Sequence, residues 1–204
     1  MSALAVGALT AALLLGSAPP AQAAKVTKKN VPGRSALVKI FPELNGELPE
    51  KYASDEIWVP TKTCGDHAPV VAKSAYSFSL GGYVDSGAAV EVAAFKSVKR
   101  AKSAFRAYKR VAKKCSKFTT SSGRKFKVKR LDHVPKVGEQ RFGMLKIERG
   151  PLLTDHRGRH VDRVAVVVIR KGKRLAVAQA YREDAKVPQA RVKKLVKVTA
   201  KKMR

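Results

Sequence analysis

The stretch from residue 96 to residue 118, KSVKRAKSAFRAYKRVAKKCSKF, most constrains what this chain can fold into. Its small or apolar residues recur at alternating spacings of three and four: Val98, Ala101, Phe105, Tyr108, Ala112 and Cys115. Lysine and arginine occupy most of the remaining positions. This pattern predicts an amphipathic helix that packs one face against a core and exposes a cationic face to solvent.

The N-terminal end of the chain is apolar and uncharged. The first 24 residues carry no charge, and the apolar run over residues 4–15 is followed by Ala21-Gln22-Ala23. An apolar core of this length ahead of a small-x-small site is typical of a secretory signal peptide; the alternative, a membrane anchor, needs a longer run. We therefore expect a signal peptide (residues 1–24), a flexible basic leader (25–34) and one domain (35–204), secreted or associated with the cell wall and without a transmembrane anchor.

Cys64 and Cys115 are the two cysteines of the chain. In an oxidising compartment two cysteines usually pair, although two buried free thiols remain the alternative. A bridge between them would tie the core face of the long helix to the loop that follows Trp58. We expect that disulfide.

The net charge of +28 is unevenly distributed. Residues 35–95 hold four lysines against eight acidic residues, whereas residues 96–204 hold 35 lysines and arginines against seven. A surface this basic attracts polyanions in a salt-dependent way, although a general basic bias in the exported proteins of the source organism would look the same. The candidate polyanion-binding residues are Lys99, Lys102, Arg106, Lys109 and Lys113 on the helix and Lys125, Lys127 and Lys129 on a following strand.

The periodicity of the rest of the chain predicts mainly strands, with residues 43–55 loop-like. Strands are expected over residues 76–80, 88–95, 125–131, 139–148, 161–169 and 175–181, and further helices over 35–41 and 188–203. On the hairpin strand 175–181, alanines at 176, 178 and 180 share one face, which suggests the close approach of a helix. The elements predict an α+β domain: an antiparallel sheet with the long helix and the C-terminal helix packed on one face.

The order of these features resembles that of exported sensor-like domains of actinobacteria, such as the extracellular domain of PknH-type receptor kinases and its free-standing secreted relatives. The residues that carry the resemblance are Trp58, Cys64-Gly65, Ala93-Ala94-Phe95, the alanine-rich helix with Cys115, Val137-Gly138-Glu139, and the 166–177 hairpin. The resemblance covers roughly residues 35–203. It implies ligand sensing or binding at a cleft, with no catalytic residues to carry over.

The sequence gives catalysis no positive support, and we expect neither a cofactor nor a metal. His156 and His160 have i, i+4 spacing, but Gly158 and polar neighbours argue against a helical metal site. The expected function is therefore non-enzymatic binding of an acidic component of the cell envelope, such as an acidic polymer or an anionic lipid surface. Non-specific nucleic-acid binding is expected at low salt, without aromatic residues free to stack on bases. The alternative is a secreted hydrolase whose site combines His67, His133 or His156 with an aspartate.

Overall fold

The computed structural model describes residues 25–81, 86–151 and 159–203. Its helical elements are η1 (Lys28–Asn30), α1 (Arg34–Ile40), η2 (Pro42–Leu44), α2 (Val98–Lys114) and α3 (Gln189–Lys202). Its strands are β1 (Pro49–Pro60), β2 (His67–Leu80), β3 (Ser86–Ala94), β4 (Lys117–Thr119), β5 (Lys125–Arg130), β6 (Gln140–Pro151), β7 (Arg159–Lys171) and β8 (Arg174–Glu183). The strands form one antiparallel sheet in the order β1-β2-β3-β8-β7-β6-β5-β4, so the expected α+β class is confirmed.

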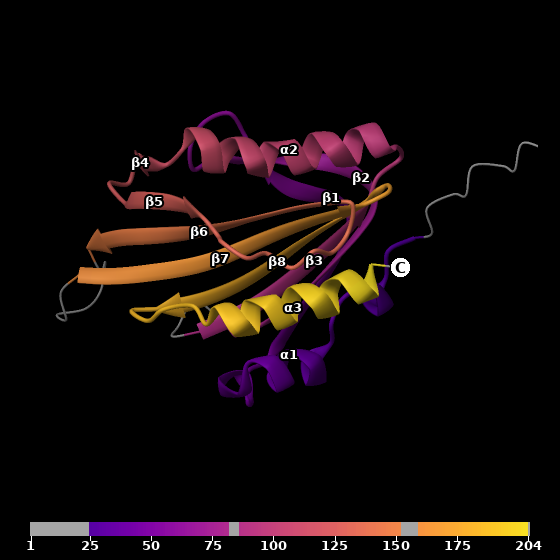
Figure 1. Ribbon diagram of the computed structural model, residues 1–204, viewed down its shortest axis with the longest axis horizontal. Coiled ribbons are helices and arrows are strands. Elements are labelled where there is room, and N and C mark those ends of the chain that lie inside the picture. Colours follow the sequence, from indigo (N-terminus) through magenta and orange to yellow (C-terminus); the bar gives the residue numbers. More distant parts are fainter. Residues whose placement is uncertain (1–24, 82–85, 152–158, 204) are drawn as a thin grey trace, which may run out of the picture.

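The sheet is a middle layer, with α2 on one face and α1 and α3 on the other (Figure 1). Alternate residues of β7 supply the two cores: Val166 and Val168 pack with α2, whereas Val167 and Ile169 pack with α3. The expectation that both helices pack on one face is therefore wrong. A central strand that is apolar on both faces requires a covering layer on each side, because either face left in water would expose its side chains.

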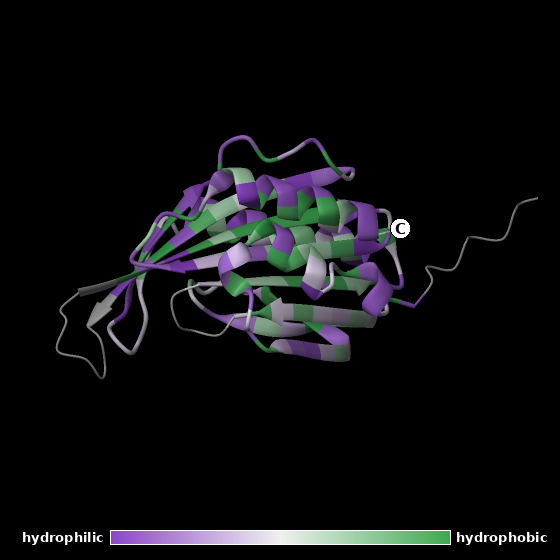
Figure 2. Cartoon of the chain, turned by 90° about the horizontal axis from the view of Figure 1, so that it is seen from below, coloured by the Kyte–Doolittle hydropathy of each residue, from purple (hydrophilic) through white to green (hydrophobic). Residues whose placement is uncertain are grey.

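The α3 face is built on small residues, as predicted. Ala176, Ala178 and Ala180 of β8 are each at most 1% exposed and belong to the same core as Leu195 and Val196 of α3. Without bulky side chains on the strand, the helix can approach the sheet closely. Figure 2 shows this arrangement as hydrophobic central strands beneath helices that alternate between hydrophobic and hydrophilic positions.

Residues 25–34 are part of this core, which corrects the expectation of a flexible leader. Val26 and Val31 are 3% and 2% exposed, and the backbone N–H of Val26 donates to Oγ of Ser74 at 2.8 Å. Asn30 lies in a short 3-10 turn and donates from its side chain to the carbonyl of Lys202. The segment is thus bonded to β2 through Ser74 and to the end of α3 through Lys202.

Helix α2 follows the predicted pattern over most of its length. Ser97 caps it by accepting from the backbone N–H of Arg100 at 3.2 Å, and Phe105 and Tyr108 are buried. The helix ends at Lys114, earlier than the predicted 118, because β4 begins at Lys117. The structured residues include no helix that is long and apolar enough to cross a membrane.

The sheet curves around α2. Strand β1 is at one end of the strand order and β5 is next to the other end, yet α2 contacts both strands. The hydroxyl of Tyr108 donates to the carbonyl of Trp58 at 3.0 Å, and Cys64, between β1 and β2, is bonded to Cys115 at the end of α2. The disulfide is confirmed. Residues 49–55, expected to be loop, instead belong to the long strand β1 that this hairpin requires.

Removal of the disulfide is expected to destabilise the protein strongly. The bond joins residues separated by 51 positions, and the chain-entropy relation gives about 4 kcal/mol for a loop of this length. Denaturant unfolding of a Cys64→Ser/Cys115→Ser variant should show this loss against the oxidised wild type. A reducing agent should reproduce the loss in the wild type and leave the double variant unchanged; equal stability of the two proteins would contradict the proposed importance of the bridge.

Candidate ligand-binding groove

A candidate ligand-binding groove lies where a loop, rather than a strand, covers part of the sheet. Strand β5 pairs with residues 144–149 of β6, so the first residues of β6, 140–143, are not paired with β5. The segment 131–139 runs along this part of β6 instead, between the layers of α2 and α3 (Figure 1). The backbone N–H of Leu131 donates to the carbonyl of Gly143 at 2.9 Å. A Cβ on Gly143 would lie 2.6 Å from a methyl carbon of Val134, so glycine is required for the loop to pack this closely.

An ion pair anchors the far end of this loop. The guanidinium of Arg170, only 3% exposed, donates to Glu139 at 2.6 Å and to the side-chain oxygen of Gln140 at 2.6 Å. Glu139 also accepts from the backbone N–H of Gly172 at 2.8 Å. That backbone hydrogen bond and the contact with Arg170 lower the pKa of Glu139. The loop end is therefore held by charged hydrogen bonds to β7 and the β7–β8 turn.

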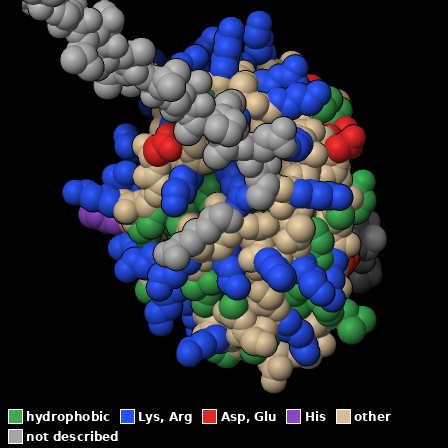
Figure 3. Space-filling view, turned by 90° about the vertical axis from the view of Figure 1, so that its right-hand side faces the viewer, with side chains coloured by type: hydrophobic (Ala, Val, Ile, Leu, Met, Phe, Trp, Pro, Cys, Tyr) green, Lys and Arg blue, Asp and Glu red, His purple; other side chains and the backbone are tan. Residues whose placement is uncertain are grey.

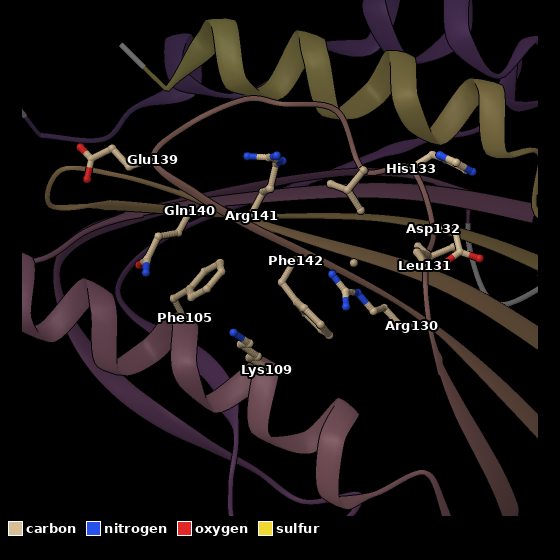
Figure 4. A pocket seen from close by; sticks show the side chains of 12 residues that line it. Phe105, Lys109, Arg130, Leu131, Asp132, His133, Glu139, Gln140, Arg141 and Phe142 are labelled. Carbon is tan, nitrogen blue, oxygen red and sulfur yellow. The ribbon is translucent and has the colours of Figure 1, made fainter.

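Between α2, this loop and the start of β6 is a cavity of about 540 Å³. Figure 4 shows Phe105 and Lys109 extending from α2 toward Phe142 of β6, with the guanidinium of Arg130 directed to the same space. Lys109 and Arg130 are exposed, and the ion pairs found among the described residues involve neither of them. Two cations beside two phenyl rings form a site suited to an anion that also has an apolar or ring-shaped part.

The acidic residues at the groove are directed elsewhere. Asp132 and Glu139 line its rim, but their carboxylates point away from the space between Lys109 and Arg130 (Figure 4). Arg141 lies on the other side of the strand and points toward the loop and α3. The interior of the groove is therefore cationic.

The structure divides the predicted polyanion-binding residues between two faces of the sheet. The five on α2, Lys99, Lys102, Arg106, Lys109 and Lys113, are exposed, and Lys109 lines the groove. On β5, Val128 packs into the α2 core, so the alternating Lys125, Lys127 and Lys129 project from the opposite face. Figure 3 shows that lysine and arginine also spread over the end of the molecule seen there, with few acidic groups.

The histidines invoked for a hydrolase are not assembled into one site in the described part of the chain. His67 lies at the start of β2, three residues after Cys64. Although part of the residue is exposed, desolvation of its ring and then the charge of Lys146 lower its pKa. His133 lies in the loop at the rim of the groove and points away from its interior (Figure 4). His156 lies outside the described residues. Among the described residues that line the groove, none carries a hydroxyl or thiol nucleophile, and no group of potential metal ligands is found in the described part of the chain.

Glu91 is a half-buried acid that no motif in the sequence indicated. It lies on β3 opposite Val177, on the face that packs against α2, and burial raises its pKa to about 7. Its charge also contributes, after burial, to a raised pKa of Tyr108. A single acidic residue within an otherwise apolar strand was the available signal, but periodicity alone does not reveal that this face is covered.

The comparisons with known proteins include an extracellular domain of similar fold. No family model matches the chain, and no curated protein matches it. The structure is similar to the crystal structure of the extracellular domain of PknH from Mycobacterium tuberculosis, with a TM-score of 0.51 and 7% sequence identity. The similarity covers 89% of this chain and 96% of that chain. It confirms the distant relation of fold that the sequence resemblance implies.

Glu91 is expected to make stability depend on pH. Because its pKa is raised in the folded state, folding is favoured at low pH, and this contribution is lost as pH rises from about 4.5, its unfolded value, through about 7. Between pH 4 and pH 8 the wild type should lose on the order of 3 kcal/mol more unfolding free energy than Glu91→Gln. Denaturant unfolding across this range measures the difference. Glu50→Gln, at an exposed position of β1, is the control, and parallel profiles for wild type and Glu91→Gln would contradict the assignment.

Proposed function

We propose that this protein is an exported, non-enzymatic, sensor-like domain that binds an anionic component of the cell envelope in the groove between α2 and residues 131–143. The observation that carries the proposal is the placement of Lys109 and Arg130 at one cavity beside Phe105 and Phe142 (Figure 4). A phosphate or carboxylate can bridge the two cations, while the rings contact the rest of the ligand.

The groove has the size and polarity of a small-ligand site. Ligand cavities are commonly about 300–1,000 Å³, and the groove volume of about 540 Å³ lies within that range. Each hydrogen bond to a charged group contributes roughly 1.5–3 kcal/mol, so two cationic contacts are enough to select an anion over its neutral analogue. The ion pair between Arg170 and Glu139 fixes one end of the loop that borders the groove.

Two further observations support export and a binding role. The disulfide between Cys64 and Cys115 suits an oxidising compartment, and the PknH domain with a similar fold is extracellular by its description. The carboxylates of Asp132 and Glu139 and the ring of His133 point away from the interior of the groove (Figure 4), which favours binding over covalent catalysis. An acidic polymer or lipid head group of the envelope is the natural source of such an anion.

The test uses glucose 6-phosphate and glucose as a charged and an uncharged probe. Nuclear magnetic resonance titration should show glucose 6-phosphate shifting the amide signals of Lys109, Arg130 and the 131–143 segment, whereas glucose leaves them in place. Lys109→Gln/Arg130→Gln should weaken binding by about tenfold or more, because two charged contacts are lost.

The matched control is Arg100→Gln/Lys114→Gln, which removes the same charge from exposed positions of α2 outside the groove. It should change the affinity by less than about twofold. Equal weakening in both double variants would mean that the phosphate responds to net charge alone, and conversion of the probe to a product would contradict a non-enzymatic role.

A further inference from the structure

A second cationic surface lies on the outer face of β4, β5 and β6, away from α2. The strand register places Lys117 opposite Lys127, and Lys125 opposite Arg149. All four side chains are exposed. They line a concavity of about 540 Å³ whose lining, as far as the structure describes it, contains no acidic residue.

This arrangement is unfavourable for the isolated protein. Like charges directly opposite each other on neighbouring strands destabilise a sheet, and here two such pairs are adjacent. The nearby acid Glu148 is opposite Phe126, on the α2 side, and pairs with Arg124 at 2.8 Å. Among the described residues of this surface, the outer cations therefore repel one another with no carboxylate between them.

Protection of a sheet edge does not explain the arrangement. Edge strands often carry lysine to prevent pairing with other chains, which would account for Lys117 on β4. Strands β5 and β6 are interior strands of the sheet, so Lys125, Lys127 and Arg149 need another explanation. A bound anion would relieve the repulsion that all four side chains share.

The geometry of the surface favours a chain of charges. Neighbouring strands are about 4.8 Å apart and alternate residues of a strand about 6.8 Å apart, so the cations form a grid with those two spacings. Lys125, Lys127 and Lys129 continue the grid in a row along β5. Such a row can follow a linear polymer that carries a negative charge at each repeat.

Other features of the molecule argue against a bilayer or nucleic-acid bases as the partner. The large exposed apolar residues Tyr52, Trp58 and Val71 lie on β1 and β2, across the sheet from this surface. Phe118 and Phe126 also line the concavity, but they stack on each other with ring centres 4.8 Å apart, so each ring already has an aromatic partner. Acyl chains therefore meet no large exposed apolar residue at this surface, and a base would have to add to an aromatic stack that is already formed.

We propose that the outer face of β4–β6 is a second binding surface, independent of the α2 groove, that takes an extended polyanion through its backbone charges. The residues that contact the polymer are Lys117, Lys125, Lys127, Lys129 and Arg149. Since this surface and the groove lie on opposite faces of the sheet, each can be occupied while the other is full.

The test exploits the repulsion between the cross-strand pairs. Lys127→Glu/Arg149→Glu turns both like-charged pairs into opposite-charged pairs, so the variant should unfold at the same temperature as the wild type or higher. Its affinity for fluorescently labelled inorganic polyphosphate should nevertheless fall by about tenfold or more. The slope of log K against log salt should decrease in magnitude by about 1.5, since two contacts are removed.

The control variant, Lys51→Glu/Lys73→Glu, makes the same change in net charge at exposed positions of β1 and β2. It should retain the affinity for polyphosphate within about twofold. Equal loss in both variants, or a lower unfolding temperature for Lys127→Glu/Arg149→Glu, would overturn the proposal. The proposal would also be overturned if Lys127→Glu/Arg149→Glu lost affinity only for phosphatidylglycerol vesicles or only for single-stranded DNA. Such a result would identify a bilayer or bases as the partner.

The result of this test can be distinguished from the result of the glucose 6-phosphate test of the groove. Lys127→Glu/Arg149→Glu should leave the binding of glucose 6-phosphate unchanged, and Lys109→Gln/Arg130→Gln should leave most of the polyphosphate affinity in place. Failure of the outer surface would therefore leave the proposed function standing, and the reverse also holds.

Discussion

The attachment of the β1–β2 hairpin to the end of α2 is the constraint on which the rest of the structure depends. The strand order places β1 far from β5, and the sheet must curve for α2 to contact both. The Cys64–Cys115 bond and the hydrogen bond from Tyr108 to the carbonyl of Trp58 fix that curvature from the β1 side. With α2 held in place, the loop 131–139 closes the opposite side of the helix and leaves the groove between them.

The curved sheet also separates the charges of the two halves of the sequence. Residues 35–95, with a net negative charge, include β1, β2 and β3 at one side of the strand order. Residues 96–204 supply the other strands, α2, α3 and nearly all the cations. Because β5 alternates between the α2 core and solvent, the cations of this half are divided between two faces. One set borders the groove beside α2, and the other lies on the outer face of β4–β6.

The sequence was sufficient to predict the helices and strands whose apolar residues recur at a regular spacing. Residue spacing predicted the apolar stripe of α2, the alanine face of β8 and the burial of Leu195 and Val196. The disulfide was predicted because two cysteines usually pair in the oxidising compartment expected for this chain. The faces that the helices cover could not be predicted, since residues 164–169 are apolar on both sides and accept a helix on either. The groove could not be predicted from residue spacing, because it depends on a loop packed against Gly143 and on the ion pair between Arg170 and Glu139.

Hydrogen exchange of backbone amides, compared between oxidised and reduced protein, tests most directly whether the sulfur bridge holds α2 against a curved sheet. Reduction is expected to accelerate exchange in α2 and around residues 60–67, while the amides of α3 and of the paired central strands β7 and β8 retain their protection. Uniform acceleration across both faces, or unchanged exchange in α2, would contradict this account of the fold and of the groove that depends on it.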